Sequence, residues 1–315
     1  MRRCVEDLGA TELVLAACSG GADSTAMSAA LAFQAPRLGL RGGAVVVDHG
    51  LQDGSAERSS AAAAILRDLG LDPVEVVTAS PTGPGGPEAA AREARYAALD
   101  GTADRLGAAA VLLGHTRDDQ AETVLLGLAR GSGARSLAGM PGRRGRYRRP
   151  LLDLPRATVR AAADGLPTWE DPHNAEDAFT RSRVRHHVLP LLEQQLGNGA
   201  GSVAAALART ATLLRQDAEA LERWAACEHE EAGRGPGKLD VGALQQLLPA
   251  VRTRVLRRAA VQAGCPPTDL SAGHVGELDR LLTDWHGQGP LHLPGGVRAT
   301  RRCGTLSLTT DRAEG

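Results

Sequence analysis

Residues 19–25, with the sequence SGGADST, restrict the fold of this chain more than any other stretch. They follow the apolar run 13–17 and precede the apolar segment 27–33, so the pattern predicts a strand, a glycine turn and a helix in that order. Backbone N–H groups at a helix N-terminus have no partner within the helix and attract anions. The two glycines let an oxyanion approach the main chain, and the hydroxyl side chains add donors. The stretch therefore predicts a phosphate-binding loop.

Two other glycine-rich phosphate loops are excluded. The G-x-x-x-x-G-K-[ST] loop needs a lysine, and Lys238, the only lysine in the chain, has Ala232 and Leu239 where that motif requires glycine and a hydroxyl residue. The dinucleotide-binding fingerprint needs three glycines at a spacing that residues 19–25 do not have.

The first two thirds of the chain alternate short apolar runs with helical segments. Residues 43–47, 73–77 and 108–113 are predicted as further strands, and helices are expected over 56–69, 88–106 and from the region of 116 to Ala129. Strands that alternate with helices of this length are typical of an α/β fold with a doubly wound parallel sheet. We expect the polar residues that follow each strand to meet in one crevice.

A glycine-rich segment, residues 197–201, is the best linker candidate. It predicts a catalytic domain over residues 1–196 and a smaller domain over 197–315, mainly helical, with a terminal sheet built from 297–302 and 305–310. No apolar run reaches about 18 residues and the N-terminus lacks a signal core, so we expect no membrane partner and a cytoplasmic location.

The densest set of titratable groups follows the strand at 108–113. His115, Asp118, Asp119 and Glu122 have the spacing of one helical face. One interpretation is a helix N-cap, which accounts for Asp118 or Asp119 but not for all four groups. The other is a site for Mg²⁺ or for a bound ammonium group opposite the phosphate loop.

Residues 130–149 contain seven arginines and no acidic residue, although the net charge of the chain is only −1. A solvated basic loop is one reading of such a run. Contact with a polyanion is the reading we favour, because no counter-ion is present in the segment. A nucleic acid would then be bound by a local patch rather than by the global field.

Several motifs resemble those of known enzymes. Residues 19–24 resemble the pyrophosphate-binding loop of the N-type ATP pyrophosphatases, called the PP-loop. Seven further motifs occur in the order typical of the bacterial tRNA(Ile)-lysidine synthetase family, and an eighth near the C-terminus is similar to its final part. They are VDHGL at 47–51, AREARY at 91–96, HTRDDQAET at 115–123, RGSG at 130–133, RPLL at 149–152, EDPHN at 170–174, RSRVRH at 181–186 and LPGGV at 293–297.

The resemblance implies adenylation of the wobble cytidine in the CAU anticodon of tRNA(Ile), followed by attack of L-lysine. It implies ATP and Mg²⁺ as cofactors and leans toward a homodimer. The implied catalytic residues are Asp23, His115, Asp119 and Glu122, with Asp119 and Glu122 binding lysine and the proton acceptor left open among His115 and the two carboxylates. Mg²⁺ is assigned to Asp23 and Asp118. ATP and pyrophosphate are assigned to Ser19, Gly20, Gly21, Ala22, Asp23, Ser24, Thr25, Val47, Asp48 and His49. tRNA is assigned to Arg92, Arg95, Arg130, Arg143, Arg144, Arg181, Arg183 and Arg185.

Two alternatives have to be considered. A tRNA thiolation enzyme has a similar loop but relies on C-x-x-C pairs, and none of the five cysteines of this chain forms such a pair. A non-catalytic, nucleotide-dependent RNA-binding protein would have no structural need for Asp23, Asp118, Asp119 and Glu122 together. The sequence therefore favours the enzyme.

Overall fold

The computed structural model describes residues 1–48, 50, 54–79, 87–131, 133–169, 179–197 and 202–310. The chain splits into two compact units, Met1–Arg215 and Gln216–Gly315, and each is described by itself. The division falls inside one long helix, α10 (Val203–Glu231), so residues 197–215 belong to the first unit. Of the linker predicted at 197–201, only Gly197 lies within the described residues.

The first unit alternates strands and helices, as predicted. Its strands are β1 (Leu13–Cys18), β2 (Arg41–Asp48), β3 (Val74–Thr78), β4 (Ala108–Leu113), β5 (Arg143–Arg144) and β6 (Tyr147–Arg148). Its helices are α1 (Arg2–Val5), α2 (Ala22–Gln34), η1 (Pro36–Leu38), α3 (Ser55–Asp68), α4 (Pro87–Leu106), α5 (Arg117–Ala129), α6 (Ala134–Leu137), α7 (Arg156–Ala161), α8 (Thr180–Arg183), η3 (Val184–Val188), α9 (Leu189–Leu196) and the first part of α10.

The sheet of this unit has the strand order β3-β2-β1-β4-β6-β5. All neighbours are parallel except β5 and β6, which form an antiparallel pair. The predicted α/β fold with a parallel sheet is thus confirmed, while the β5–β6 pair was not expected because its arginine-rich strands show no apolar alternation. The chain reverses its direction across the sheet between β1 and β4, and ligands of open α/β sheets bind at such a reversal, beyond the carboxyl ends of the strands.

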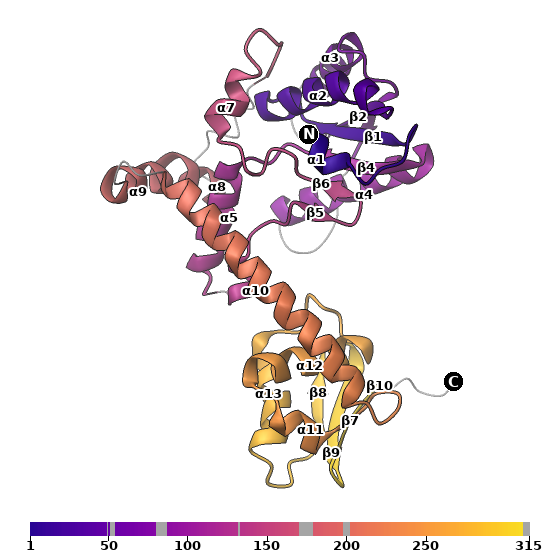
Figure 1. The fold of residues 1–315 in the computed structure, drawn as a ribbon, viewed down its shortest axis with the longest axis vertical. Coiled ribbons are helices and arrows are strands. Elements are labelled where there is room, and N and C mark those ends of the chain that lie inside the picture. The colour runs from indigo at the N-terminus through magenta and orange to yellow at the C-terminus, as the bar shows by residue number, and fades with distance from the viewer. Residues whose placement is uncertain are drawn as a thin grey trace. The chain divides into compact units, whose positions relative to one another are not determined.

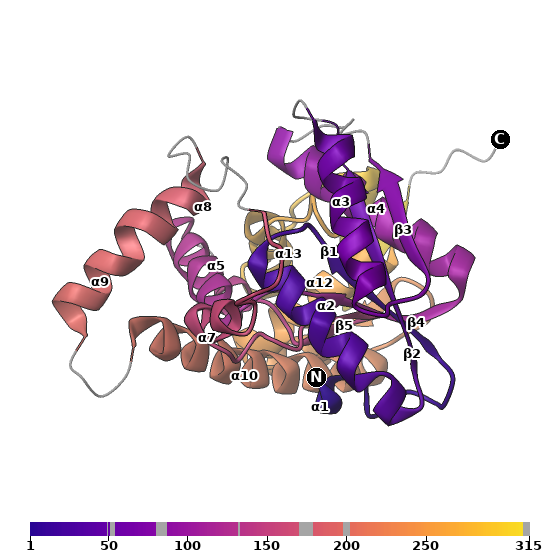
Figure 2. The ribbon, with the colours of Figure 1, turned by 90° about the horizontal axis from the view of Figure 1, so that it is seen from above.

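Helices cover both faces of the sheet (Figures 1 and 2). Alternate residues of β1 point to opposite sides, so Val14 and Ala16 pack with α2 and α3, while Leu13 and Leu15 pack with Leu99 and Ala103 of α4. A smaller cluster joins Ala121 of α5 to Val184, Leu189 and Ala204. These contacts hold the carboxyl ends of β1 and β4 in fixed positions.

The second unit combines helices with a separate four-stranded antiparallel sheet, of order β7-β10-β9-β8 (Figure 1). The predicted pair β9 (Val297–Arg302) and β10 (Thr305–Thr310) is present, and both turn residues, Cys303 and Gly304, have positive φ, as a tight hairpin requires. The remaining elements are β7 (Lys238–Asp240), α11 (Val241–Gln246), α12 (Pro249–Gln262), α13 (Ala272–Thr283), β8 (Leu291–Leu293) and η4 (Pro294–Gly296). Across the described part of the chain, every helix is too short or too polar to cross a lipid bilayer.

Candidate active site

The predicted phosphate loop connects β1 to α2. Gly20 has a φ of +80°, which a residue with a Cβ rarely adopts, and Gly21 is the N-cap of α2. The loop is held by one buried side chain, Ser24, whose hydroxyl donates to the Gly21 carbonyl at 2.9 Å and accepts from the Ser19 N–H at 3.2 Å. Thr25 is buried behind it. The loop therefore has a fixed shape and leads into the N-terminus of a 13-residue helix, where anions bind.

The end of β4 packs against this loop because Gly114 has no side chain. A Cβ at that position would lie 3.1 Å from the Cα of Ser24 and 3.3 Å from its backbone nitrogen, so that the loop would have to shift by a few tenths of an ångström. The close approach brings His115 and Thr116, which follow β4, beside the phosphate loop.

The two neighbouring aspartates at the start of α5 have different partners. Asp119 forms a capping box with Thr116, since its Oδ2 accepts from the Thr116 N–H at 2.7 Å and from the Thr116 hydroxyl at 2.8 Å. Asp118 accepts from the backbone N–H of Arg156 at 2.7 Å. His115 precedes α5, so the expectation that all four titratable groups share one helical face is wrong for His115.

Three arginines surround the two carboxylates predicted to bind lysine. Arg156 donates to Asp119 at 2.8 Å and to Glu122 at 3.0 Å. Arg181 and Arg185 each donate from Nε to Glu122 at 2.8 Å, and Arg185 also contacts Asp119 at 3.1 Å. Glu122 is completely buried. This arginine cluster, Arg156, Arg181 and Arg185, was missed: Arg156 carries no local signal, and the other two were expected on a tRNA-facing surface.

Arg156 also connects the carboxylates to the phosphate loop. Its Nε lies 3.6 Å from Oδ2 of Asp23, too far for a hydrogen bond. Among the described residues, neither this Nε nor Oδ1 of Asp23 has a hydrogen-bond partner, although both atoms are buried. Burial raises the pKa of Asp23 and the charge of Asp119 adds to that effect, while Arg156 opposes it. Asp23 and Glu122 thus lie in one site, each within 4 Å of a different nitrogen of the same guanidinium group.

His115 is neutral at physiological pH. Arg149 donates from Nε to its Nδ1 at 3.2 Å, which leaves the proton on Nε2. Burial, together with the charges of Arg149, Arg181 and Arg95, lowers the pKa of His115 to about 3 against the opposing effect of Asp119. Burial would raise the pKa of Asp119, but Arg156, the Thr116 N–H and Arg181 together lower it to about 2.

Replacing His115 by Gln tests whether His115 is neutral, through the pH dependence of the free energy of unfolding. The pKa of a histidine in the unfolded chain is about 6.5, so between pH 6.5 and 3 the unfolded state binds more protons and the folded state loses stability as the pH falls. From pH 7 to 5 the contribution of His115 to the free energy of unfolding should fall by about 2 kcal/mol, and the His115→Gln variant should not show that loss. Urea unfolding of both proteins at the two pH values measures it. Equal losses would mean that His115 is not held neutral.

The other predicted ATP-binding and tRNA-binding residues lie at separate places in the first unit. Asp48 is buried at the end of β2, where its Oδ1 accepts from the Gly50 N–H at 3.0 Å, and Val47 is half-buried beside it; His49 lies outside the described residues. Arg92 and Arg95 are on α4, with their guanidinium carbons 5.0 Å and 5.8 Å from the ring centre of Tyr96.

The arginine-rich segment 130–149 does have counter-ions, from other parts of the chain. Arg143 contacts Asp7 at 2.5 Å, Arg148 pairs with the same carboxylate, and Arg146 contacts Asp104 at 2.6 Å. The premise that these arginines lack partners is therefore wrong for three of them. Arg130 and Arg144 are exposed, as is Arg183 on α8.

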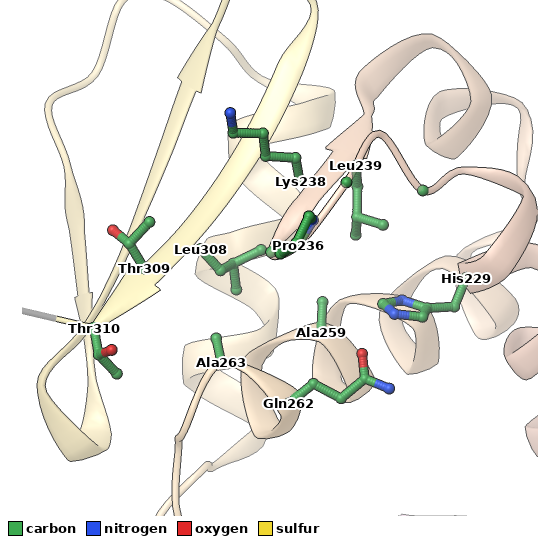
Figure 3. A pocket seen from close by; sticks show the side chains of 13 residues that line it. His229, Pro236, Lys238, Leu239, Ala259, Gln262, Ala263, Leu308, Thr309 and Thr310 are labelled. Carbon is green, nitrogen blue, oxygen red and sulfur yellow. The ribbon is translucent and has the colours of Figure 1, made fainter.

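The second unit contains a cavity of about 490 Å³, seen in Figure 3. His229, Lys238, Gln262 and the end of β10 line it, together with a glycine-rich turn. None of the residues predicted for catalysis, ATP or tRNA is among its lining residues. No cluster of three or more His, Cys, Asp or Glu side chains suited to a metal occurs in the described ranges.

Comparisons with known proteins cover both units. Residues 1–192 match a family model described as a PP-loop domain, and residues 239–306 match one described as a TilS substrate binding domain. The chain is 60% identical to a tRNA(Ile)-lysidine synthase of Thermobifida fusca, over 99% of this chain and 96% of that one. It is 59% identical to that of Streptomyces coelicolor, over 94% and 85%, and 56% identical to that of Salinispora tropica, over 96% and 92%.

A solved structure gives an independent comparison of the fold. The U34-tRNA thiolase NcsA from Methanococcus maripaludis, with its 4Fe-4S cluster, superposes with a TM-score of 0.57 and covers 68% of this chain and 77% of its own. At 19% identity the likeness concerns the fold alone.

Proposed function

The chain belongs to the tRNA(Ile)-lysidine synthase family, and we propose that its first unit adenylates the oxygen on carbon 2 of a tRNA cytidine with ATP and then joins lysine to carbon 2. It is an ATP-dependent ligase that modifies tRNA. One observation carries the assignment to these residues: Arg156 contacts Asp119 and Glu122 with one nitrogen and faces Asp23 with another. ATP chemistry and lysine chemistry therefore share one site.

In the first step, the oxygen on carbon 2 of the cytosine attacks the α-phosphorus of ATP. A bond forms between that oxygen and phosphorus, the bond to the bridging oxygen breaks, and pyrophosphate leaves with the electron pair. Catalysis of such a transfer depends on position and on neutralising charge. Ser19, Gly20, Gly21, Ala22, Ser24 and Thr25 surround the amino end of α2, where the β- and γ-phosphates would bind.

The residues present fit a magnesium ion at one atom. Oδ1 of Asp23 is a buried carboxylate oxygen without a partner in the described chain, and Mg²⁺ prefers such ligands while keeping its remaining positions for water and phosphate. Asp118 is a weaker candidate ligand for Mg²⁺, because its Oδ2 already accepts from the Arg156 N–H. When bound, the ion would neutralise charge on the departing pyrophosphate.

In the second step, the ε-amine of lysine attacks carbon 2, the bond between carbon 2 and its oxygen breaks, and AMP leaves with the electron pair, while the nitrogen loses one proton to solvent. The lysine ammonium group has a pKa near 10.4, so providing neutral amine at pH 7 costs about 4.6 kcal/mol. The low pKa values of His115 and Asp119 argue against either group as the final proton acceptor. Arg156, Arg181 and Arg185 favour the neutral amine, since nearby cations lower the pKa of an ammonium group. Neutral His115 can donate from Nε2 to substrate.

The tRNA backbone would contact exposed arginines of the first unit, and the second unit, which matches a TilS substrate binding domain, would also bind tRNA. Replacing Arg144 by Ala should remove one phosphate contact and reduce the slope of log affinity against log salt by about 0.9. Replacing Arg143 should change the slope by less than half as much, because Asp7 already neutralises it. Filter binding of tRNA over a salt series measures both. Two slopes equal to that of the unaltered protein would contradict a tRNA contact in this segment.

The function is tested by incubating the protein with ATP, labelled lysine and a panel of tRNA transcripts. We expect lysine incorporation only into tRNA(Ile) with a CAU anticodon, together with release of AMP and pyrophosphate. Sulfur transfer in place of lysine transfer would favour the thiolation alternative, against which the absence of a C-x-x-C pair counts. Sedimentation of the same sample tests the expected homodimer. Because its proposed substrate is tRNA, we propose that the protein acts in the cytoplasm.

A further inference from the structure

Arg156 is the residue whose contacts the two steps above leave incompletely explained. Nothing in the sequence motifs assigns it a role, yet its side chain is only 13% exposed and lies between the phosphate loop and the lysine carboxylates. Its backbone is held as well, because the Arg156 N–H donates to Asp118 at the first residue of α7. Two elements therefore fix the guanidinium group in place.

Two nitrogens of this guanidinium group differ in their partners. Nη2 donates to Asp119 at 2.8 Å and to Glu122 at 3.0 Å. Nε is buried and has no hydrogen-bond partner in the described part of the chain, and Oδ2 of Asp23 lies 3.6 Å from it. An unpaired buried donor costs roughly 1–3 kcal/mol, so such a group is expected to have a partner at some stage of function.

A second unpaired atom belongs to the carboxylate that faces Nε. Oδ1 of Asp23 is also buried without a partner. The unpaired N–H and the unpaired carboxylate oxygen belong to one loosely spaced ion pair beside the phosphate loop. Such a pair is complementary to a phosphoryl group and its cation. The phosphoryl oxygen would accept from Nε, and the cation would bind the carboxylate.

We propose that Arg156 is a catalytic residue of the adenylation step, which donates from Nε to a phosphoryl oxygen of ATP while its Nη2 holds Asp119 and Glu122. The proposal rests on the proposed function. No bond to Arg156 forms or breaks; its charge stabilises the oxygens of the α-phosphorus as pyrophosphate leaves. The same group aligns the lysine-binding carboxylates with the phosphorus under attack.

The test compares Arg156→Ala with Arg181→Ala, since both remove a guanidinium group from Glu122 but only Arg156 faces Asp23. Release of pyrophosphate in the presence of tRNA and absence of lysine isolates the first step. We expect Arg156→Ala to slow it about 100-fold or more, as removal of a donor to a transition-state oxygen does, and at least 30-fold more than Arg181→Ala. Equal effects of the two variants would overturn the proposal.

Two further measurements test the role of Arg156 without relying on turnover or on the folding of the Ala variant. Calorimetry with α,β-methylene-ATP, without tRNA or lysine, should show about tenfold weaker binding for Arg156→Ala and a change within about twofold for Arg181→Ala. Arg156→Lys keeps the charge and carries the test if the Ala variant does not fold; it should still lose about tenfold in pyrophosphate release, because a single ammonium group cannot serve both sides. Unaltered release by Arg156→Lys would overturn the proposal. If the unaltered protein releases no pyrophosphate, the proposed function fails instead.

Discussion

Replacing Asp23 by Asn is expected to reduce tRNA-dependent pyrophosphate release by about 100- to 1,000-fold while raising the temperature of unfolding. The loss of activity follows from removing the charge that would hold the cation at Oδ1. The gain in stability follows from the pKa of Asp23, which burial raises above its unfolded value, so that the ionised carboxylate opposes folding at neutral pH. Asparagine has the same shape without that charge, and Arg156 keeps its bonds to Asp119 and Glu122.

The matched control is Asp240→Ala in the second unit, which should differ from Asp23→Asn in its effects on the unfolding temperature and on pyrophosphate release. Asp240 accepts from the Ala243 N–H at 2.7 Å and caps α11, so its loss should lower the unfolding temperature and leave pyrophosphate release intact. Calorimetric scans and a phosphate-coupled assay measure the two effects. A lower unfolding temperature for Asp23→Asn, with activity retained, would remove Asp23 from the site.

Replacing Glu122 by Gln is expected to raise the lysine concentration needed for half-maximal rate by about 100-fold. Truncating one partner of a buried charge pair costs roughly 2–5 kcal/mol, and tenfold in affinity corresponds to about 1.4 kcal/mol. The incoming amino group of lysine loses its buried, charged acceptor, whereas the loop that binds the phosphates is unchanged. We therefore expect the affinity for α,β-methylene-ATP to stay within about twofold of the unaltered protein.

The same substitution should also lower stability, because Arg156, Arg181 and Arg185 lose a shared acceptor. Breaking a buried pair costs roughly 3–5 kcal/mol, and the lower end applies here since Arg181 and Arg185 are 31% and 25% exposed. Glu75→Gln is the control, as this glutamate pairs with Arg105 on the surface and should affect neither lysine use nor activity. An unchanged lysine requirement for Glu122→Gln would exclude Glu122 from lysine binding.

Local sequence patterns were sufficient to predict the strands and helices on which the site residues lie. Glycine placement and apolar runs predicted β1, the phosphate loop and α2, as well as β4 followed by α5, because steric limits on the backbone and burial of apolar faces act over a few residues. The same patterns predicted that residues 19–25 and 115–122 would lie together, since parallel strands present their carboxyl ends at one edge.

Charge pairing was predicted poorly, and the residues concerned show why. Arg181 and Arg185 were expected to face tRNA, but the fold pairs them with Glu122, which is 59 and 63 positions away along the chain. The segment 130–149 seemed to lack counter-ions, yet Asp7, 136 positions from Arg143, supplies one. The family resemblance implied Asp119 as a lysine ligand, and the sequence left open whether Asp118 or Asp119 caps the helix, which depends on where α5 begins.

The sequence by itself determined the fold class, the family and the two loops that form the crevice, because short-range backbone preferences and motif order are properties of the chain read locally. Only the tertiary structure decided which arginines neutralise which carboxylates, and that Arg156 stands between Asp23 and Glu122. The physical reason is that ion pairs and desolvation depend on distances in space, and those distances are set when β1, β4, α5 and α7 pack together.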